Sequence, residues 1–185
     1  SMTMLKGNFL DVGCGTGAPL KKIISHLEAY YDRVVGVDLH EEYTKKAQEV
    51  FKDHPRVEIH NCDFYEIKKV AGDRKFSTIF FSFSFMLMPD HIKALMLSQS
   101  ILEKDGRICF LMTLNKKSFP LLDRLKPLIK KITTVDFGKV VYERDFEEVV
   151  NIANLEIVKK ERIQTLFNPL LYIFPVHYIE CKVKA

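Results

Sequence analysis

Short apolar runs alternate with amphipathic stretches along the first part of the chain. The apolar runs are typical of buried strands, and they cover residues 8–12, 33–38, 57–61, 76–83 and 107–114. Apolar residues recur at helical spacing between them, which predicts a first helix with Pro19 near its start and further helices over 41–51 and over 89–102. We expect the last of these helices to close with a turn at 104–106. Strands and helices that alternate in this way indicate an α/β domain with a mostly parallel sheet.

The alternation becomes irregular after residue 115. Residues 116–132 form a basic stretch with an apolar side, and Pro127 interrupts it, so we expect a bent helix there. The remaining elements are a short helix and two strands, expected over 145–153, 155–163 and 172–183. Neither an internal repeat nor a linker divides the sequence, so we expect a single domain over 1–185.

The composition excludes several classes of protein. Lys and Arg number 28 and Asp and Glu 24, so the net charge is +4 at pH 7, too small to favour a nucleic acid partner. The longest apolar run, over 76–89, is too short to span a bilayer, and no secretory signal opens the sequence. The cysteines show neither zinc spacing nor a C-x-x-C pair, which predicts no metal site. We therefore expect a cytoplasmic protein without a transmembrane segment.

A glycine-rich turn follows the first predicted strand. The sequence NFLDVGCGTG covers residues 8–17 and places Gly13, Gly15 and Gly17 directly before a helix. Glycine allows a sharp turn and lets a ligand approach the backbone closely, and the helix start offers free N–H groups. A simple tight turn needs only one glycine, so the three together predict a ligand site. The spacing G-x-G-x-G differs from the dinucleotide pattern G-x-G-x-x-G.

Acidic residues stand near the ends of the first three predicted strands. Asp11 precedes the glycine turn, Asp38 ends the second strand, and Asp63 follows the third. The carboxyl ends of parallel strands share one edge of the sheet, so these acids should converge there. Three acids disfavour a polyphosphate and favour a ligand with hydroxyls, an amino group and a positive centre. A purely local role, as a helix cap, is the alternative for Asp38 and especially for Asp63.

These residues carry a family resemblance. Residues 9–17 resemble motif I of the class I S-adenosylmethionine-dependent methyltransferases, and the likeness continues through 37–38, 62–64 and 102–107. The resemblance implies a Rossmann-like fold with a seven-stranded, mostly parallel sheet, an antiparallel last strand and helices on both faces. It also implies S-adenosylmethionine as the cofactor, which becomes S-adenosylhomocysteine after methyl transfer.

The resemblance further implies which residues bind this cofactor. They are Asp11, Gly13, Cys14, Gly15, Thr16, Gly17, Asp38, Leu39, Cys62, Asp63, Phe64, Ser82 and Phe83. Residues 13–17 would line the methionine moiety, and Asp11 would lie beneath them near its amino group. Asp38 would bind the ribose, and Leu39 would contact the adenine. Asp63 would accept from the adenine amino group beside Phe64, whereas Ser82 and Phe83 would face the methyl group.

Two departures from the family pattern bear on catalysis. The family usually carries a longer segment before motif I, with a helix that helps to close the site, and we expect this chain to lack it because motif I begins at Phe9. Where many relatives show two histidines after the fourth strand, this chain has MLMP over 86–89, so no general base is assigned. Candidates to line the acceptor pocket are Met86, Tyr142, Glu143, Tyr172 and His177.

Methyl transfer to a small or lipid-like acceptor is the function that we expect, because the predicted mouth of the site is rich in Phe and Met. The sequence lacks the Asn/Asp-Pro-Pro-Tyr and Pro-Cys motifs of DNA-modifying relatives, so DNA is not expected as a partner. One alternative is a partner subunit that binds the cofactor without activity. Another is aminopropyl transfer, although the sequence SFS over 82–84 lacks the acid that would hold a polyamine.

Overall fold

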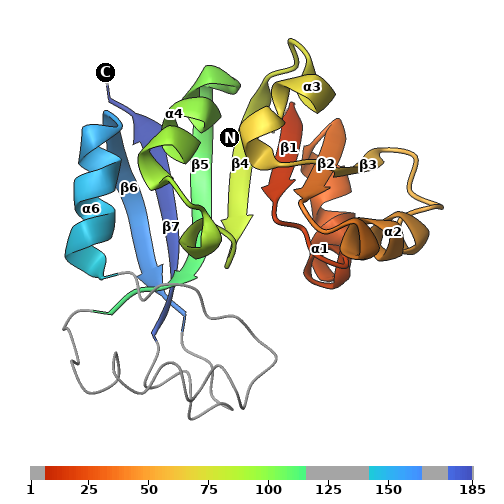
Figure 1. Cartoon of the computed structure of the whole chain (residues 1–185), viewed down its shortest axis with the longest axis horizontal. Helices are drawn as coiled ribbons and strands as arrows, with labels where there is room; N and C mark the ends of the chain where they lie inside the picture. Colours follow the sequence, from red (N-terminus) through yellow and green to blue (C-terminus); the bar gives the residue numbers. More distant parts are fainter. Residues whose placement is uncertain (1–6, 116–141, 164–174, 185) are drawn as a thin grey trace.

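The computed structural model of the chain describes residues 7–115, 142–163 and 175–184. Within these ranges, seven strands form one sheet in the order β3-β2-β1-β4-β5-β7-β6 (Figure 1). Their bounds are Asn8–Val12 (β1), Arg33–Asp38 (β2), Val57–Asn61 (β3), Phe76–Ser82 (β4), Leu102–Thr113 (β5), Leu155–Arg162 (β6) and Val176–Val183 (β7). Strands β1 to β5 pair in parallel, whereas β7 lies antiparallel to both β5 and β6. The predicted fold class is confirmed.

Helices cover both faces of the sheet. They are α1 (Ala18–Tyr30), α2 (Glu41–Val50), α3 (Lys68–Ala71), α4 (His91–Ser100) and α6 (Glu143–Ile152), with 3-10 turns η1 (Phe64–Glu66) and η2 (Phe85–Leu87). Helices α1 and α2 share one core cluster with β1, β2 and β3, whereas α3, α4 and α6 share the cluster on the opposite face. Figure 1 shows α4 and α6 side by side over the half of the sheet that contains β5, β7 and β6.

Alternation along the strands divides the core between the two faces. On β1, Leu10 belongs to the cluster beneath α4, and Phe9 belongs to the cluster beneath α1. Aromatic rings fill the larger cluster, where Phe81 stacks on Phe110 with centroids 5.5 Å apart and meets Phe85 edge to face. Burial of each such ring stabilises the fold by roughly 1.5–3 kcal/mol. Because β1 is covered on both faces, it gives the glycine loop a rigid base.

The structure corrects the predicted boundary between α4 and β5. The helix covers only His91–Ser100, and Asp90 caps it by accepting from the backbone N–H of Lys93 at 2.9 Å. Strand β5 then begins at Leu102, so the predicted turn at 104–106 lies inside it as an irregularity. The pairing of β5 with β4 explains this irregularity. Phe76 pairs with Leu102 and Thr78 pairs with Arg107, so the four residues 103–106 of β5 lie opposite the single residue Ser77 of β4, as in a bulge.

Other predicted elements agree with the structure to within a few residues. The predicted strands over 8–12, 33–38 and 57–61 are confirmed without change. The helix expected over 145–153 begins earlier, at Glu143. The stretch 116–132 and residue Tyr172 lie outside the described residues. In the described ranges, no helix has the length and apolar character needed to cross a membrane.

Candidate functional site

The glycine loop between β1 and α1 depends on left-handed backbone conformations. Gly13, Gly15 and Gly17 have φ values of 77°, 56° and 76°, which residues with a Cβ rarely adopt. The backbone N–H groups of Gly13 and Cys14 both donate to the carbonyl of Val37, at 2.8 and 3.1 Å. The loop therefore curls against the end of β2 and brings the start of α1 to the carboxyl edge of the sheet.

The glycines differ in what surrounds them. A Cβ on Gly13 would overlap the Cβ of Ser84, and a Cβ on Gly17 would lie 2.7 Å from the ring of Phe51. At Gly15, no atom of the described residues lies within 4 Å of the position that a Cβ would take. Packing thus requires glycine at 13 and 17, whereas the backbone of Gly15 faces open space that a ligand can enter.

Asp38 joins the end of β2 to this loop. Its Oδ2 accepts from the backbone N–H of Gly15 at 2.9 Å, and its Oδ1 accepts from the N–H of His40 at the same distance. The cap residue of α2 is His40, so Asp38 lies before the helix and is not its cap. Each carboxylate oxygen can accept more than one hydrogen bond, so Asp38 retains acceptor capacity for ligand hydroxyls.

Asp11 lies in β1 beneath the loop and is 4% exposed. Its Oδ1 has no hydrogen-bond partner among the described residues. Burial, and to a smaller extent the charge of Asp38, raises the pKa of Asp11 to about 7. Of the three acids predicted to converge, Asp11 and Asp38 lie close enough for their charges to interact, and Asp11 lacks a positive partner among the described residues.

Asn61, to which the sequence reasoning gave no role, holds the other side of the site. Its side-chain amide donates to the carbonyls of Asp38 and Leu39, at 3.1 and 2.9 Å, and the N–H of Cys62 also donates to Asp38. These bonds fix the backbone on which Leu39 stands, with 66% of that residue exposed. The sequence contains a signal for this role of Asn61, because a polar residue stands at the end of the predicted strand over 57–61, two positions before Asp63.

Asp63 and Phe64 follow β3. Asp63 accepts from the N–H of Tyr65 at 2.9 Å and caps the short turn η1, so its local role is confirmed. Phe64 is buried in the core, with its ring edge to face against Phe81 at 5.5 Å. The adenine contacts expected of both residues remain predictions. Because the ring of Phe64 is packed against the core, it would contact a ligand as part of a fixed wall of the site.

The end of β4 presents an exposed aromatic residue on a strained backbone. Phe83 has φ 57°, is 41% exposed, and donates its N–H to the carbonyl of Leu111 at 2.8 Å. Next to it, the buried Ser84 donates its hydroxyl to the carbonyl of Val12, which binds the chain after β4 to the start of the glycine loop. A left-handed Phe costs about 1 kcal/mol or more, and such strain is concentrated at functional sites.

Of the residues predicted to line the acceptor pocket, Met86 and His177 are buried, whereas Tyr142 and Glu143 are half-buried. Met86 is buried, and its sulfur accepts from the hydroxyl of Thr113 at 3.4 Å. His177 is also buried; its Nδ1 lies 3.1 Å from the carbonyl of Pro175, and burial lowers its pKa. Glu143, half-buried at the start of α6, pairs with Lys160 of β6. Tyr142 lies beside Glu143 and bridges to Asn115 of the chain after β5.

The cysteines offer neither a reactive thiol nor a metal site at the loop. Burial raises the pKa of Cys14, and the charges of Asp11 and Asp38 raise it further, so the thiol stays protonated at neutral pH. Cys109 and Cys181 are buried too, as expected, whereas Cys62 is only half-buried. Over the described ranges, no group of three His, Cys, Asp or Glu side chains could hold a metal ion.

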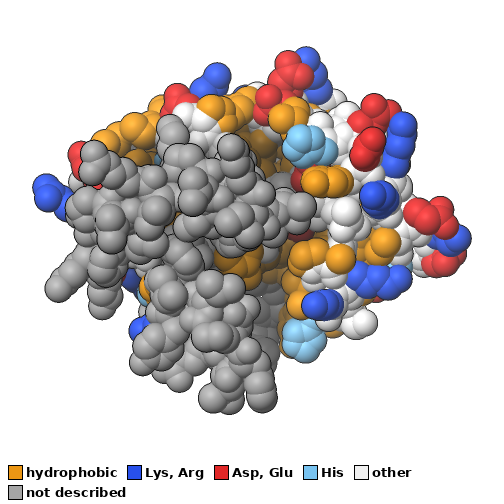
Figure 2. All heavy atoms as spheres, turned by 60° about the horizontal axis from the view of Figure 1, so that its bottom comes forward, with side chains coloured by type: hydrophobic (Ala, Val, Ile, Leu, Met, Phe, Trp, Pro, Cys, Tyr) orange, Lys and Arg blue, Asp and Glu red, His pale blue; other side chains and the backbone are white. Residues whose placement is uncertain are grey.

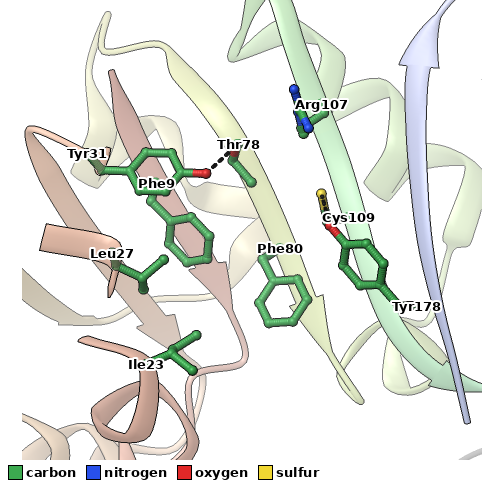
Figure 3. Close-up of a pocket in the computed structure, with 9 residues that line it drawn as sticks. All are labelled: Phe9, Ile23, Leu27, Tyr31, Thr78, Phe80, Arg107, Cys109 and Tyr178. Atoms are coloured by element: carbon green, nitrogen blue, oxygen red, sulfur yellow. Dashed lines mark hydrogen bonds between the residues drawn. The ribbon is translucent and has the colours of Figure 1, made fainter. Parts of the chain in front are cut away.

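Hydrophobic side chains are exposed around the carboxyl edge of the sheet, which comes forward in Figure 2. Leu39, Phe83 and Leu87, from the segments that follow β2 and β4, are among the exposed ones. A separate cavity of about 240 Å³ lies on the face of the sheet that carries α1 (Figure 3). No residue of the glycine loop lines it, and the hydroxyls of Tyr31 and Thr78 already pair there at 2.9 Å. The candidate cofactor site is therefore the loop edge.

Comparisons with known proteins show what this chain resembles. A curated relative, malonyl-(acyl-carrier protein) O-methyltransferase 1 of Ilyobacter polytropus, is 26% identical over 121 residues, which cover 65% of this chain and 43% of the relative. The chain thus spans less than half the length of that relative.

Solved structures show the same fold at low identity. A SAM dependent methyltransferase from Aquifex aeolicus has a TM-score of 0.71 at 16% identity, with coverage of 97% of this chain and 85% of that one. Magnesium protoporphyrin IX methyltransferase from Synechocystis PCC 6803, solved with bound SAH, has a TM-score of 0.68 at 15% identity and coverage of 99% and 76%. A family model described as a methyltransferase domain matches residues 9–106, more than half of the chain. The chain belongs to this family of methyltransferase domains.

Proposed function

We propose that the protein transfers a methyl group from S-adenosylmethionine to a small or lipid-like acceptor. The observation that carries the proposal is the bond between Asp38 and Gly15, 2.9 Å long, which places a carboxylate and an open glycine backbone at one edge of the sheet. The orphaned carboxyl of Asp11 lies beneath them and suits a ligand with a positive charge. The residues present therefore fit this cofactor.

The proposed cofactor contacts follow from these positions. Residues 13–17, with Cys14 and Thr16 among them, would surround the methionine moiety above Asp11. Asp38 would accept hydrogen bonds from the ribose hydroxyls, because its oxygens lie beside the glycine loop and each can accept a further hydrogen bond. Leu39 would cover the adenine with its exposed side chain.

The remaining contacts lie on either side of this core. Cys62, Asp63 and Phe64 would form the far wall at the adenine, and the exposed position of Asp63 leaves it able to accept from an amino group. Ser82 and Phe83 would face the methyl group, from a strand end that neighbours the glycine loop.

The chemistry asks little of the protein beyond alignment. When bound, the cofactor supplies an activated methyl group that an acceptor atom displaces in line. The chain would hold the acceptor against Phe83 and exclude water from the site. A base is needed only for an acceptor that must lose a proton, and Tyr142, Glu143 and His177 are the titratable acceptor-side candidates among the described residues.

An apolar or carrier-bound acceptor suits the edge better than a nucleic acid. Leu39, Phe83 and Leu87 expose apolar surface there. The names of two similar proteins refer to a malonyl group on acyl-carrier protein and to magnesium protoporphyrin IX. We infer an acceptor with a substantial apolar part and a nucleophilic oxygen or nitrogen.

The test is transfer of label from methyl-labelled S-adenosylmethionine to a panel of fatty acids, malonyl thioesters and small amines. Label in one class of acceptor, abolished by Asp38→Ala, is the expected result. Tight cofactor binding with transfer to no acceptor would favour the inactive partner subunit instead. Transfer of an aminopropyl group from decarboxylated S-adenosylmethionine would favour the aminopropyltransferase.

A further inference from the structure

The carboxyl group of Asp11 lies in surroundings that disfavour a charge. In the register of the sheet it stands between Gly36 of β2 and Phe80 of β4, and neither side chain can donate a hydrogen bond. The side chain is almost completely buried, and Oδ1 has no partner among the described residues. A buried carboxylate without a donor or a cation is costly, so the group favours its neutral, protonated form.

The titratable groups around Asp11 do not supply a positive charge. From β2, Asp38 acts on it with a like charge. From the glycine loop, the Cys14 thiol lies close enough for the two groups to influence each other, and that thiol is neutral. After β4, the hydroxyl of Ser84 already donates to the carbonyl of Val12. None of the described residues therefore supplies a positive partner for Asp11.

We propose that cofactor binding is coupled to release of a proton from Asp11, which is a neutral acid in the free protein and a carboxylate beneath the bound, positively charged cofactor. This inference rests on the proposed function. The O–H bond of the carboxyl group breaks, the electron pair stays on the carboxylate, and the proton passes to the solvent. The surroundings of Asp38 differ, because its two oxygens accept the N–H groups of Gly15 and His40.

Linkage gives the direction of the effect. The pKa of Asp11 in the free protein is about 7, and a cationic ligand lowers it. Affinity should therefore rise with pH up to about 7, by as much as roughly tenfold per pH unit, and then become constant. S-adenosylmethionine carries a sulfonium and an ammonium group, whereas S-adenosylhomocysteine carries only the ammonium. The affinity of the first ligand should therefore change over a wider pH range, because two positive charges lower the pKa of Asp11 further than one.

The experiment is titration calorimetry of the full chain with S-adenosylhomocysteine from about pH 5.5 to about pH 8.5, in two buffers that differ in ionisation enthalpy. For the wild type we expect weaker binding at the acidic end of the range. We also expect a fraction of a proton to be released on binding, which is measured as a difference in the observed heat between the two buffers. Asp11→Asn keeps the shape of the side chain but cannot release a proton. Its affinity should match the wild type near pH 5.5 and be about tenfold or more weaker near pH 8. The matched control is Asp32→Asn, because Asp32 is an exposed acid at the opposite edge of the sheet. This variant should keep the wild-type dependence of affinity on pH.

Two results would overturn the inference. One is wild-type affinity that does not change with pH and releases no proton in either buffer, a measurement that does not depend on how any variant folds. The other is an Asp11→Asn protein that keeps the wild-type pH profile, which would show that the coupling does not come from Asp11. Absence of binding at every pH is a distinct outcome, because it would contradict the proposed function itself.

Discussion

The Oδ2 atom of Asp38 lies 2.9 Å from the backbone nitrogen of Gly15, although the two residues are 23 positions apart in the chain. This bond connects the end of β2 to the middle of the glycine loop. Gly15 is also the glycine of the loop whose missing Cβ would point into open space. The acid proposed to hold the ribose therefore also fixes the backbone proposed to receive the methionine moiety.

Asp38→Ala should weaken cofactor binding by about 2–4 kcal/mol, the scale of charge-assisted hydrogen bonds, because it removes the ribose acceptors and releases the loop. Asp38→Asn should cost less, since its amide oxygen can still accept from Gly15 or from a hydroxyl. Calorimetry with S-adenosylhomocysteine measures both. An Asp38→Ala protein that is folded and binds as the wild type does would contradict the assignment.

Substitutions of two loop glycines should separate binding from stability. Gly15→Ala adds only the strain of a left-handed Ala, about 1 kcal/mol, but its methyl group enters the open space and should weaken S-adenosylhomocysteine binding by tenfold or more. Gly17→Ala places a Cβ 2.7 Å from the Phe51 ring, between α1 and α2, and should destabilise the fold by about 2 kcal/mol or more. Denaturant unfolding and calorimetry on both variants check this. Equal stabilities in the two variants would show that the contact with Phe51 is unimportant.

Asp11→Asn should stabilise the protein more at alkaline than at acidic pH. The ordinary pKa of the group is 3.8 and the folded value is about 7, so the folded state holds the proton more tightly. Stability is therefore lost as pH rises from about 4 to about 7, by a few kcal/mol at most, and stays low above that range. The Asn variant does not lose stability in this way. Urea unfolding of the variant and the wild type near pH 5 and near pH 8 measures the difference in their free energies of unfolding. A difference that is the same at both pH values would show that Asp11 does not titrate in this range.

The backbone of Phe83 predicts an unusual order of stabilities. Its φ of 57° suits glycine better than alanine. Phe83→Gly should therefore be more stable than Phe83→Ala by about 1 kcal/mol, against the usual order. Both variants remove the exposed ring and should lower methyl transfer. Thermal unfolding compares them, and an Ala variant at least as stable as the Gly variant would exclude strain at this position.

Much of the fold could be predicted because its periodic signals are local. The apolar runs that became β1, β2 and β3 are bounded by glycines, acids and prolines, and their limits were predicted without error. The limits of α4 and β5 were less accurate, because residues 103–106 read as a turn and their place in the sheet depends on Ser77 of β4. No local pattern contains that register.

The candidate site also combines residues that could be predicted from local sequence with residues whose roles depend on distant partners. The glycines and the acids Asp11 and Asp38 were predicted, and the structure brings them together. The amide of Asn61, the hydroxyl of Ser84 and the strain at Phe83 were not, because each depends on a partner from a different strand. The burial of Phe64 against Phe81 likewise follows from packing across the sheet and could not be predicted from the order of residues.

The central claim is that the edge formed by the glycine loop, Asp11 and Asp38 binds S-adenosylmethionine. Titration calorimetry of the chain with S-adenosylhomocysteine and, in parallel, with NAD tests it most directly. We predict one S-adenosylhomocysteine site per chain and no comparable binding of NAD, because the acids Asp11 and Asp38 around the glycine loop disfavour a diphosphate. Tighter binding of NAD than of S-adenosylhomocysteine would contradict the account.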